Sequence, residues 1–402
     1  MRILVLTQVV IYPANSGAKM KTLQVVRHLA TQHEIIYCTF ARNQQEANGT
    51  SELKELCQHI VTVSIRRSHL SDAYFLLSSL LAGDSFLLRR DERKIMHTTV
   101  KRLLQEEQID AVHVDQLNML RFMPDDWSGK VVLDEHNAVW QVIERLTQGT
   151  HNPLKRWFLQ REVRHMRRLE GLACRRADVV LTVSEQDKVA LRAVAGDAAT
   201  LVVVPITVDV EQFAHARLQR DPEPQRLLSI GTMFWLPNSE GIRWWLRTGY
   251  VALHRCCPQL CYDIVGARPP QQLEQLAANR EGVQLHGYVA DVEPFWRKAT
   301  ALVVPLLSGG GVRVKILEAM ARGVPVVTTS LGCEGLAVQH KVHVLIADTP
   351  EEFSAACLRI MQEPELAKSL MENALEQVKD LYDAKSALDV LDIIYAPKSV
   401  GA

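Results

Sequence analysis

Short apolar runs alternate with longer, helically periodic segments along most of the chain. The apolar runs are rich in Val and Ile and have the length of strands, whereas residues 17–33 place Leu, Val and Leu on one helical face. Uninterrupted apolar strands separated by helices are typical of a parallel sheet that is covered on both faces. The pattern predicts an α/β protein, with early strands at 2–7, 34–40, 60–65, 109–114, 130–135, 178–183 and 200–205.

A polar stretch at 205–225, which contains three prolines, interrupts this alternation. Because 402 residues exceed what one hydrophobic core normally serves, the length and the interruption both favour two domains. Ligands of such sheets bind beyond the carboxyl ends of the strands, so residues just after strands are the candidate site residues. The second domain is predicted to contain strands at 226–233, 260–266, 283–287, 301–306 and 324–329.

The composition limits the kinds of partner. Lys and Arg together number 46, as do Asp and Glu, which argues against nucleic acid held by bulk charge. No apolar stretch reaches the roughly 18 residues of a spanning helix, and the first residues resemble a buried strand more than a secretion signal. The eight cysteines lack the paired spacing of a zinc site, so we expect reduced, structural cysteines in a cytoplasmic protein.

Residues 309–327 read GGGVRVKILEAMARGVPVV and follow a predicted strand. Three glycines before a helix that begins near Val312 leave free N–H groups, and these together with the helix dipole favour an anion. Arg313 and Lys315 add positive charge, which suits a diphosphate. A flexible turn that lets helix and strand pack tightly agrees equally well with the glycine spacing, and neither a P-loop nor a Gly-x-Gly-x-x-Gly motif is present.

The same segment resembles the donor-site signature of glycosyltransferase family 4, which are retaining enzymes of the GT-B fold. The match is Gly-Gly-x-Arg-x-Lys-Ile-Leu-Glu-Ala-Met-Ala-x-Gly-x-Pro-Val-Val-x-Thr, followed by Gly-x-Glu-Gly-Leu. Further segments resemble the family in the same order: 12–30, 131–140, 177–187, 204–213 and 237–246. The resemblance implies a nucleotide-diphosphate sugar as donor, no metal and no other cofactor.

Two glutamates eight positions apart usually bracket the loop in that family. Glu318 matches the second, which contacts the nucleotide ribose, but Gly310 stands where the first would contact the sugar ring. A branch with Gly-Gly-Gly-x-Arg-x-Lys is therefore the closer comparison. The resemblance implies donor contacts from Gly309, Gly310, Gly311, Val312, Glu318, Gly231 and Thr232.

The strand at 226–233 is followed in many family members by an Arg and a Lys for the phosphates. Neither residue appears here before Arg243, which makes Arg313 and Lys315 the predicted partners of the leaving diphosphate and the predicted catalytic cations. Asn238 is expected to cap the helix that follows this strand.

His136 comes directly after the predicted strand at 130–135, and the family usually has a histidine there beside the donor sugar. We predict a catalytic His136 that is oriented by Asp134 and Asn137. Ser16-Gly17 resembles the paired glycines that approach the donor phosphate and the acceptor, with Ser in place of the first Gly. A structural histidine and a plain strand-to-helix turn remain open as alternatives.

Residues 155–178 contain eight Lys or Arg and three acidic residues. As a helix, this stretch could face an anionic membrane or an acceptor phosphate; the alternative is a solvated basic face that packs Trp157, Leu159 and Leu169 inward.

Taken with the resemblance, the sequence predicts two Rossmann-like domains that face each other across a cleft. These are an acceptor-side domain at 1–205 and a nucleotide-sugar-binding domain at 206–383, with a helix at about 384–400 packed back on the first. The expected activity is that of a retaining, metal-independent hexosyltransferase of polysaccharide or glycoconjugate biosynthesis. Its acceptor would be a carbohydrate or glycolipid, and residues 155–176 would allow peripheral contact with the inner face of the membrane. Three alternatives are a non-catalytic sugar-nucleotide-binding subunit, an enzyme resembling UDP-N-acetylglucosamine 2-epimerase, and a membrane-associated scaffold.

Overall fold

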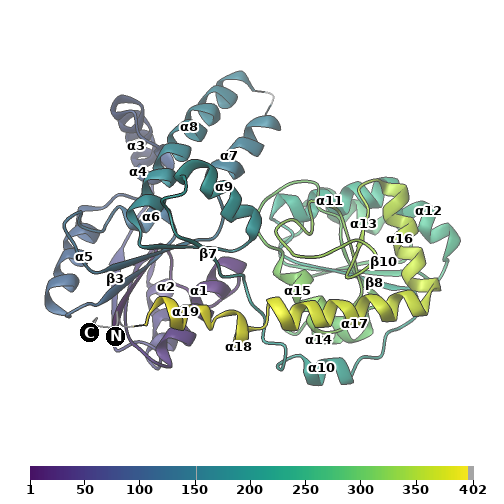
Figure 1. Cartoon of the computed structure of the whole chain (residues 1–402). Helices are drawn as coiled ribbons and strands as arrows, with labels where there is room; N and C mark the ends of the chain where they lie inside the picture. The colour runs from purple at the N-terminus through teal and green to yellow at the C-terminus, as the bar shows by residue number, and fades with distance from the viewer. Residues whose placement is uncertain (151, 397–402) are drawn as a thin grey trace. The chain divides into compact units, whose positions relative to one another are not determined.

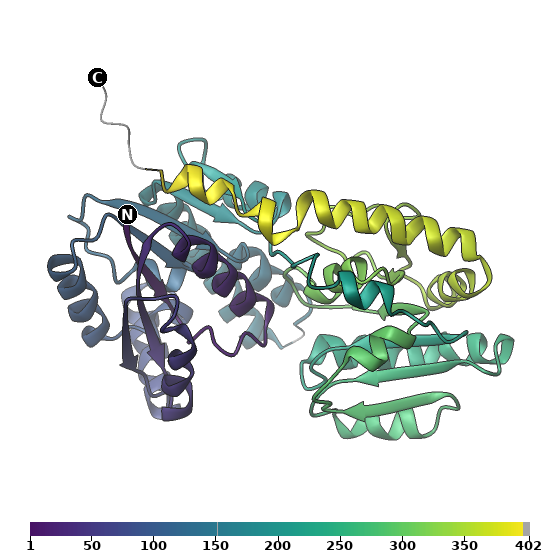
Figure 2. The same cartoon turned by 90° about the horizontal axis from the view of Figure 1, so that it is seen from below.

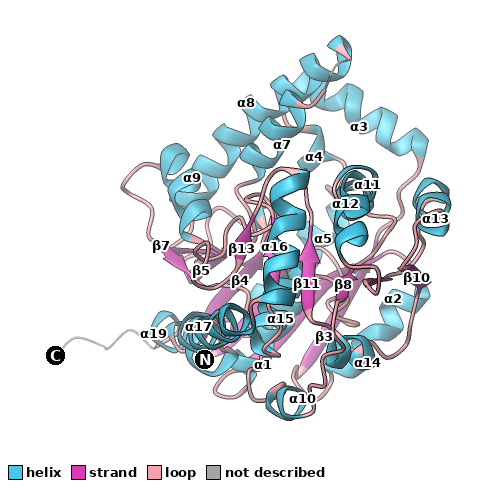
Figure 3. Ribbon diagram, turned by 90° about the vertical axis from the view of Figure 1, so that its right-hand side faces the viewer, coloured by secondary structure: helices cyan, strands magenta, loops and turns pink. Residues whose placement is uncertain are grey.

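A computed structural model describes residues 1–150 and 152–396 and divides the chain into two compact units (Figure 1). Unit 1 comprises residues 1–206 and the segment that starts at Leu388, whereas unit 2 is Thr207–Ala387. Helices and strands alternate along each unit, as the cyan and magenta ribbons of Figure 3 show.

Unit 1 contains a seven-stranded sheet in the order β3-β2-β1-β4-β5-β6-β7, and every recorded pairing is parallel. The order reverses between β1 and β4, so the loops after these two strands diverge and leave room for a ligand. The central strands are buried on both faces, which explains their unbroken apolar sequences. The strands are β1 (Arg2–Thr7), β2 (Glu34–Ala41), β3 (His59–Ser64), β4 (Ala111–Asp115), β5 (Lys130–Glu135), β6 (Val179–Thr182) and β7 (Leu201–Val203).

The helices of unit 1 connect these strands. They are α1 (Gly17–Ala30), α2 (Gln44–Asn48), the 3₁₀ helix η1 (Gly49–Leu53), α3 (His69–Ala82), α4 (Phe86–Arg89), α5 (Lys94–Glu106), α6 (Leu117–Leu120), α7 (Val139–Gln148), α8 (Pro153–Arg176), α9 (Glu185–Ala195) and α19 (Val390–Ile394). Helices α3, α4, α7 and α8 gather at one end of the unit (Figures 1 and 3). Buried Glu162 links α8 to the start of α4 by accepting a hydrogen bond from Ser85 Oγ at 2.8 Å.

Unit 2 repeats the arrangement with a six-stranded sheet in the order β10-β9-β8-β11-β12-β13, again with parallel pairings. Its strands are β8 (Arg226–Ile230), β9 (Cys261–Val265), β10 (Val283–Gly287), β11 (Ala301–Val304), β12 (Val326–Thr328) and β13 (Leu345–Ile346). Its helices are α10 (Ala214–Leu218), α11 (Leu236–Thr248), α12 (Tyr250–Cys256), α13 (Gln271–Ala278), α14 (Glu293–Lys298), α15 (Val314–Ala321), α16 (Pro350–Gln362), α17 (Pro364–Leu381) and α18 (Ala384–Ala387).

The end of the chain differs from the single helix predicted at about 384–400. Figure 2 shows the yellow segment continuing past α17 into two short helices, α18 and α19, and residues 397–402 lie outside the described part. Leu388, Leu391 and Tyr395 are buried in the same core cluster as Ile3 and Val5 of β1. This apolar contact makes the last described residues part of unit 1.

None of the described helices is long and apolar enough to cross a membrane. The eight cysteines are free thiols, and six of them are buried.

Candidate functional site

The glycine loop of unit 2, residues 308–313, lies between β11 and α15. Gly309 and Gly311 have φ angles of 98° and 84°, a region that side chains other than glycine rarely adopt. A Cβ atom on Gly309 would also lie 3.2 Å from both Pro237 and Trp235 at the start of α11. Backbone conformation and close packing therefore both favour glycine here.

Arg313 has a different place from the one predicted. Helix α15 begins at Val314 rather than near Val312, and Arg313 is its N-cap residue. The side chain is buried, and Nη1 donates hydrogen bonds to the carbonyl oxygens of Gly310, at 2.6 Å, and Gly311. In this structure Arg313 holds the shape of the loop, and its contact with a phosphate stays a prediction.

Lys315 lies beside the end of β8. Its ammonium donates to Asn238 Oδ1 at 3.1 Å, and a Cβ on Gly231 would come within 2.6 Å of Lys315 Nζ. Burial, with the charge of Arg313 as a smaller cause, lowers the pKa of Lys315 to about 8. The structure thus brings Gly231, Asn238 and Lys315 together at the carboxyl ends of β8 and β11.

The expectation that Asn238 caps α11 is wrong. Helix α11 begins at Leu236, so Asn238 lies inside its first turn. There it accepts from Lys315 through Oδ1 and donates through Nδ2 to the carbonyl oxygen of Thr232, at 3.0 Å. Asn238 therefore links the loop after β8 to α15, a role that the sequence analysis missed.

The other predicted donor residues lie in the loop and on the helix that follows it. Glu318 is on α15, half-buried, and burial raises the pKa of its carboxyl against the opposing charges of Arg322 and Lys315. Val312 is partly buried and packs against the core of unit 2. The position of Gly310 lacks a carboxylate, but Glu240 of α11 reaches the loop and accepts a hydrogen bond from Ser308 Oγ at 3.3 Å.

His136 of unit 1 is buried directly after β5, where the sequence predicted it. Its Nε2 lies 3.1 Å from Asp115 Oδ1 and 3.9 Å from Asp134 Oδ2, while Gln116 Nε2 lies 3.2 Å from Nδ1. Asp115 is therefore the nearest carboxylate, ahead of the predicted Asp134. Asp115 follows the apolar run that predicted β4, so its place after a strand could have revealed it.

A network of buried charges lies behind His136. The Lys21 ammonium pairs with Asp134 Oδ1, and Asp134 Oδ2 is 3.5 Å from His113 Nε2. Ligand atoms of Asp115, Asp134 and His136 lie within 4.8 Å of one another, a grouping that could hold a metal ion. Because Lys21 already supplies a cation to Asp134, the protein itself balances much of this negative charge.

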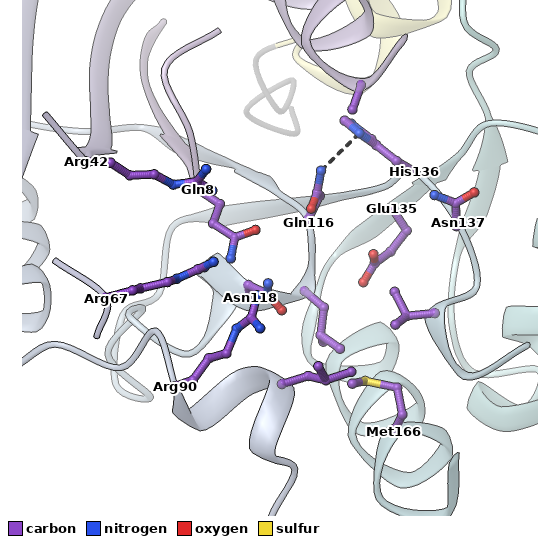
Figure 4. A pocket seen from close by; sticks show the side chains of 14 residues that line it. Gln8, Arg42, Arg67, Arg90, Gln116, Asn118, Glu135, His136, Asn137 and Met166 are labelled. Carbon is purple, nitrogen blue, oxygen red and sulfur yellow. Dashed lines mark hydrogen bonds between the residues drawn. The ribbon is translucent and has the colours of Figure 1, made fainter. Parts of the chain in front are cut away.

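A pocket of about 320 Å³ opens beside His136 at the carboxyl ends of the strands of unit 1 (Figure 4). Its polar lining includes Gln8, Arg42, Arg67, Arg90, Gln116, Asn118, Glu135, His136 and Asn137. Ser16 is the N-cap of α1 and accepts from the N–H of Lys19 at 3.5 Å. The predicted Ser16-Gly17 loop does not line the pocket, although Ala18 does.

The basic helix α8 uses several of its cations inside unit 1. Arg161 donates to the carbonyl oxygens of Ser79 and Asp84, at 2.6 and 2.9 Å, and the Arg167 guanidinium lies 4.3 Å from the Trp140 ring centre. Arg175 donates to carbonyl oxygens at the end of α9, and Arg176 donates to the carbonyl oxygen of Met123. Four of the eight basic residues therefore contact other parts of unit 1. Leu159 and Leu169 pack against the core as expected, but Trp157 is 56% exposed, so the expectation that it packs inward is wrong.

Comparison with known proteins identifies the family. Residues 16–212 match the family described as Glycosyltransferase Family 4, and residues 224–363 match Glycosyl transferases group 1. Both matched regions are of glycosyltransferase families, and together they identify this chain as a glycosyltransferase. A curated relative of this glycosyltransferase is an uncharacterised 44.6 kDa protein from the cps region of Klebsiella pneumoniae, 23% identical over 166 residues, which are 40% of this chain and 43% of the relative. The chain spans less than half the length of the curated relatives it matches.

Solved structures with the same fold cover nearly all of this glycosyltransferase. Sucrose-phosphate synthase from Thermosynechococcus elongatus has a TM-score of 0.70 at 17% identity, over 98% of each chain. HepE from Anabaena, in complex with UDP-glucose, has a TM-score of 0.68 at 15% identity, over 98% of this chain and 99% of that one. The two parallel sheets and these likenesses establish a two-domain α/β GT-B fold.

Proposed function

We propose that this glycosyltransferase moves a hexose from a nucleotide-diphosphate sugar to an acceptor hydroxyl with retention of configuration, in polysaccharide or glycoconjugate biosynthesis. The observation that carries the proposal is the meeting of Gly231, Asn238 and Lys315 beside the glycine loop. This meeting point lies where the strand order of unit 2 reverses, which is the usual ligand position in such sheets. HepE, of similar fold, is described in complex with UDP and with UDP-glucose, which supports a nucleotide-sugar donor.

The chemistry needs charge stabilisation at the leaving group. As the bond between sugar and phosphate breaks, negative charge develops on the diphosphate oxygens. In the proposed mechanism, protonated Lys315 and the N–H groups at the start of α15 stabilise this charge, without a metal or other cofactor. Glu318 would accept hydrogen bonds from the ribose hydroxyls.

The first test is a screen of UDP-, GDP- and ADP-sugars for thermal stabilisation of the full chain. One nucleotide class is expected to raise the unfolding temperature, because a ligand bound only by the folded state stabilises it in proportion to ln(1 + [L]/Kd). Product analysis with the bound sugar nucleotide then separates three activities: transfer to an added acceptor, epimerisation of the donor, and binding without turnover. No shift with any sugar nucleotide would contradict the proposal.

His136 is proposed to act in catalysis beside the donor sugar. The His136→Ala variant is expected to lower the transfer rate by roughly 100- to 10,000-fold, the usual contribution of a general acid or base, with donor affinity unchanged. The matched control is His97→Ala, since His97 is a partly exposed histidine of α5 in the same unit. Undiminished transfer in His136→Ala would remove His136 from the catalytic machinery.

Peripheral membrane contact through residues 155–176 is part of the proposal. Leu154 and Trp157 are exposed at the start of α8, next to Lys155 and Arg156. Apolar and cationic side chains together favour an anionic bilayer surface. The Lys155→Glu/Arg156→Glu variant should sediment less with phosphatidylglycerol vesicles than the parent chain; equal sedimentation would contradict the contact.

A further inference from the structure

Three arginines line the pocket of unit 1, and each comes from a different loop. Arg42 follows β2, Arg67 follows β3, and Arg90 follows α4. Figure 4 shows their side chains extending into the same region as the amides of Gln8 and Asn118. The pocket therefore has a strongly cationic side, opposite the side formed by Gln116, His136 and Asn137.

The nearby carboxyl groups neutralise only part of this charge. Asp91 is 3% exposed, receives two hydrogen bonds from Arg67 at 2.8 and 2.6 Å, and accepts a third from Gln8 at 2.7 Å. Burial, followed by the charge of Glu170, raises the pKa of Glu135 well above its usual value, which disfavours a charged carboxylate on this side of the pocket. Within the described residues, Asp91 is the carboxylate that pairs with the guanidinium groups of these arginines, through Arg67 and, at longer range, Arg90.

The three arginines differ in how many of their N–H donors the protein already uses. Arg67 spends two of its five N–H donors on Asp91. The Arg90 Nε is 3.8 Å from Asp91 Oδ2, which is too long for a hydrogen bond. Within residues 1–150 and 152–396, the Arg42 side chain has no hydrogen bond or ion pair, and its backbone N–H alone donates to Glu46. Asp91 therefore positions Arg67, while Arg42 and Arg90 keep most of their donors for a ligand.

We propose that this pocket binds a phosphate group of the acceptor substrate. A carboxylate is planar and is satisfied by one arginine fork, whereas a phosphate offers oxygens in three or more directions and suits guanidinium groups that converge from separate loops. The pocket is of the size that holds a small ligand. With its phosphate at Arg42 and Arg90, an acceptor would direct its other end towards His136. That the ligand is the acceptor rests on the proposed function.

The phosphate could belong to a soluble sugar phosphate or to a lipid headgroup. For a lipid, the structure offers an exposed apolar face on α3, near the pocket in sequence. The chain passes from Arg67 into α3 and returns at the end of α4 to Arg90. Leu70, Tyr74 and Leu81 lie on one face of α3 and are 85%, 68% and 82% exposed, respectively. Because this face lies between Arg67 and Arg90 in sequence, a lipid chain attached to the phosphate would lie against it.

The test compares the parent chain with the double variant Arg42→Gln/Arg90→Gln, both saturated with UDP so that phosphate cannot occupy the donor site. Calorimetry with glucose 6-phosphate probes the soluble source. Co-sedimentation with phosphatidylcholine vesicles, with and without dicetyl phosphate, probes the lipid source. The variant is expected to bind the effective probe about 100-fold more weakly, roughly tenfold for each arginine. Arg102→Gln on α5, an exposed arginine of the same unit, is the matched control and should bind as the parent does.

The outcomes separate this inference from the proposed function. Weakened binding in one arm supports the phosphate site and names its source, provided that the variant keeps the parent's circular dichroism and UDP affinity. Absence of binding in both arms, or equal binding by parent and variant, overturns it. If UDP fails to stabilise the parent while the arginines still govern phosphate binding, the proposed donor is wrong and the phosphate site stands.

Discussion

Replacing Lys315 with alanine is expected to weaken nucleoside-diphosphate binding on the order of 100-fold and to reduce transfer below detection. Lys315 is the cation that meets Gly231 and Asn238 at the carboxyl ends of β8 and β11. A charge-assisted hydrogen bond contributes about 1.5–3 kcal/mol, and about 3 kcal/mol corresponds to that loss of affinity. The transition state has more charge on the phosphate than the bound donor, so catalysis should fall further than binding.

The pH dependence makes this prediction specific. Burial lowers the pKa of Lys315 to about 8, so the ammonium loses its proton as the pH rises through that value. The diphosphate prefers the protonated form, and affinity should therefore fall between about pH 7 and pH 9, with proton uptake on binding. Lys315→Arg keeps its charge in this range and should bind with little pH dependence.

Calorimetry in two buffers of different ionisation enthalpy measures both the affinity and the proton uptake. Lys379→Ala is the control, because Lys379 is an exposed lysine of α17 in the same unit. A Lys315→Ala variant that folds normally and binds the diphosphate as tightly as the parent would show that Lys315 has no role in the donor site.

The strands of the fold were largely predictable because the apolar runs along the chain have both the residue types and the lengths of buried strands. Each predicted strand appears within a few residues of its observed limits, since buried parallel strands need continuous apolar sequence. Strand β13 was missed because two residues are too few to form a pattern. The predicted helix at about 384–400 is broken because Leu388 and Leu391 turn into the core of unit 1, a tertiary contact that helical periodicity does not encode.

The candidate site was predictable only where a residue follows a strand or belongs to a motif. His136 and the glycine loop satisfied these conditions. Asp115 and Asp134 beside His136 also belong to predicted strand ends. The pairings of Lys315 with Asn238 and of Lys21 with Asp134 were not predictable, because these residues are 77 and 113 positions apart. Lysine is almost never buried without a partner, so the sequence alone indicates an exposed helical turn around Lys21, and only the fold brings Asp134 beside it.

The pair of Lys21 and Asp134 gives the largest expected effect on stability. The two side chains are 1% and 0% exposed, so Lys21→Met would leave a buried carboxylate without its cation. Breaking such a pair costs about 3–5 kcal/mol. We expect a corresponding loss of the free energy of unfolding of unit 1 near pH 7, measured by urea denaturation, while Lys54→Met, at an exposed lysine between η1 and β3, should change it little.

The dependence on pH distinguishes lost charge compensation from lost packing. Burial alone would raise the pKa of Asp134, but the charge of Lys21, followed by the nearby His113, outweighs burial and holds it well below its usual value. In the folded parent, this depressed pKa contributes stability above about pH 4 that is lost as the pH falls through the range below it. In Lys21→Met the uncompensated carboxyl should protonate at a higher pH, so the stability difference from the parent should shrink between about pH 7 and pH 5. A double variant is the control for this prediction. Lys21→Met/Asp134→Asn removes both charges and should recover at least half of the lost stability at pH 7, because replacing both members of a buried pair is often nearly neutral. Equal destabilisation of the single and double variants at both pH values would instead assign the loss to packing around α1.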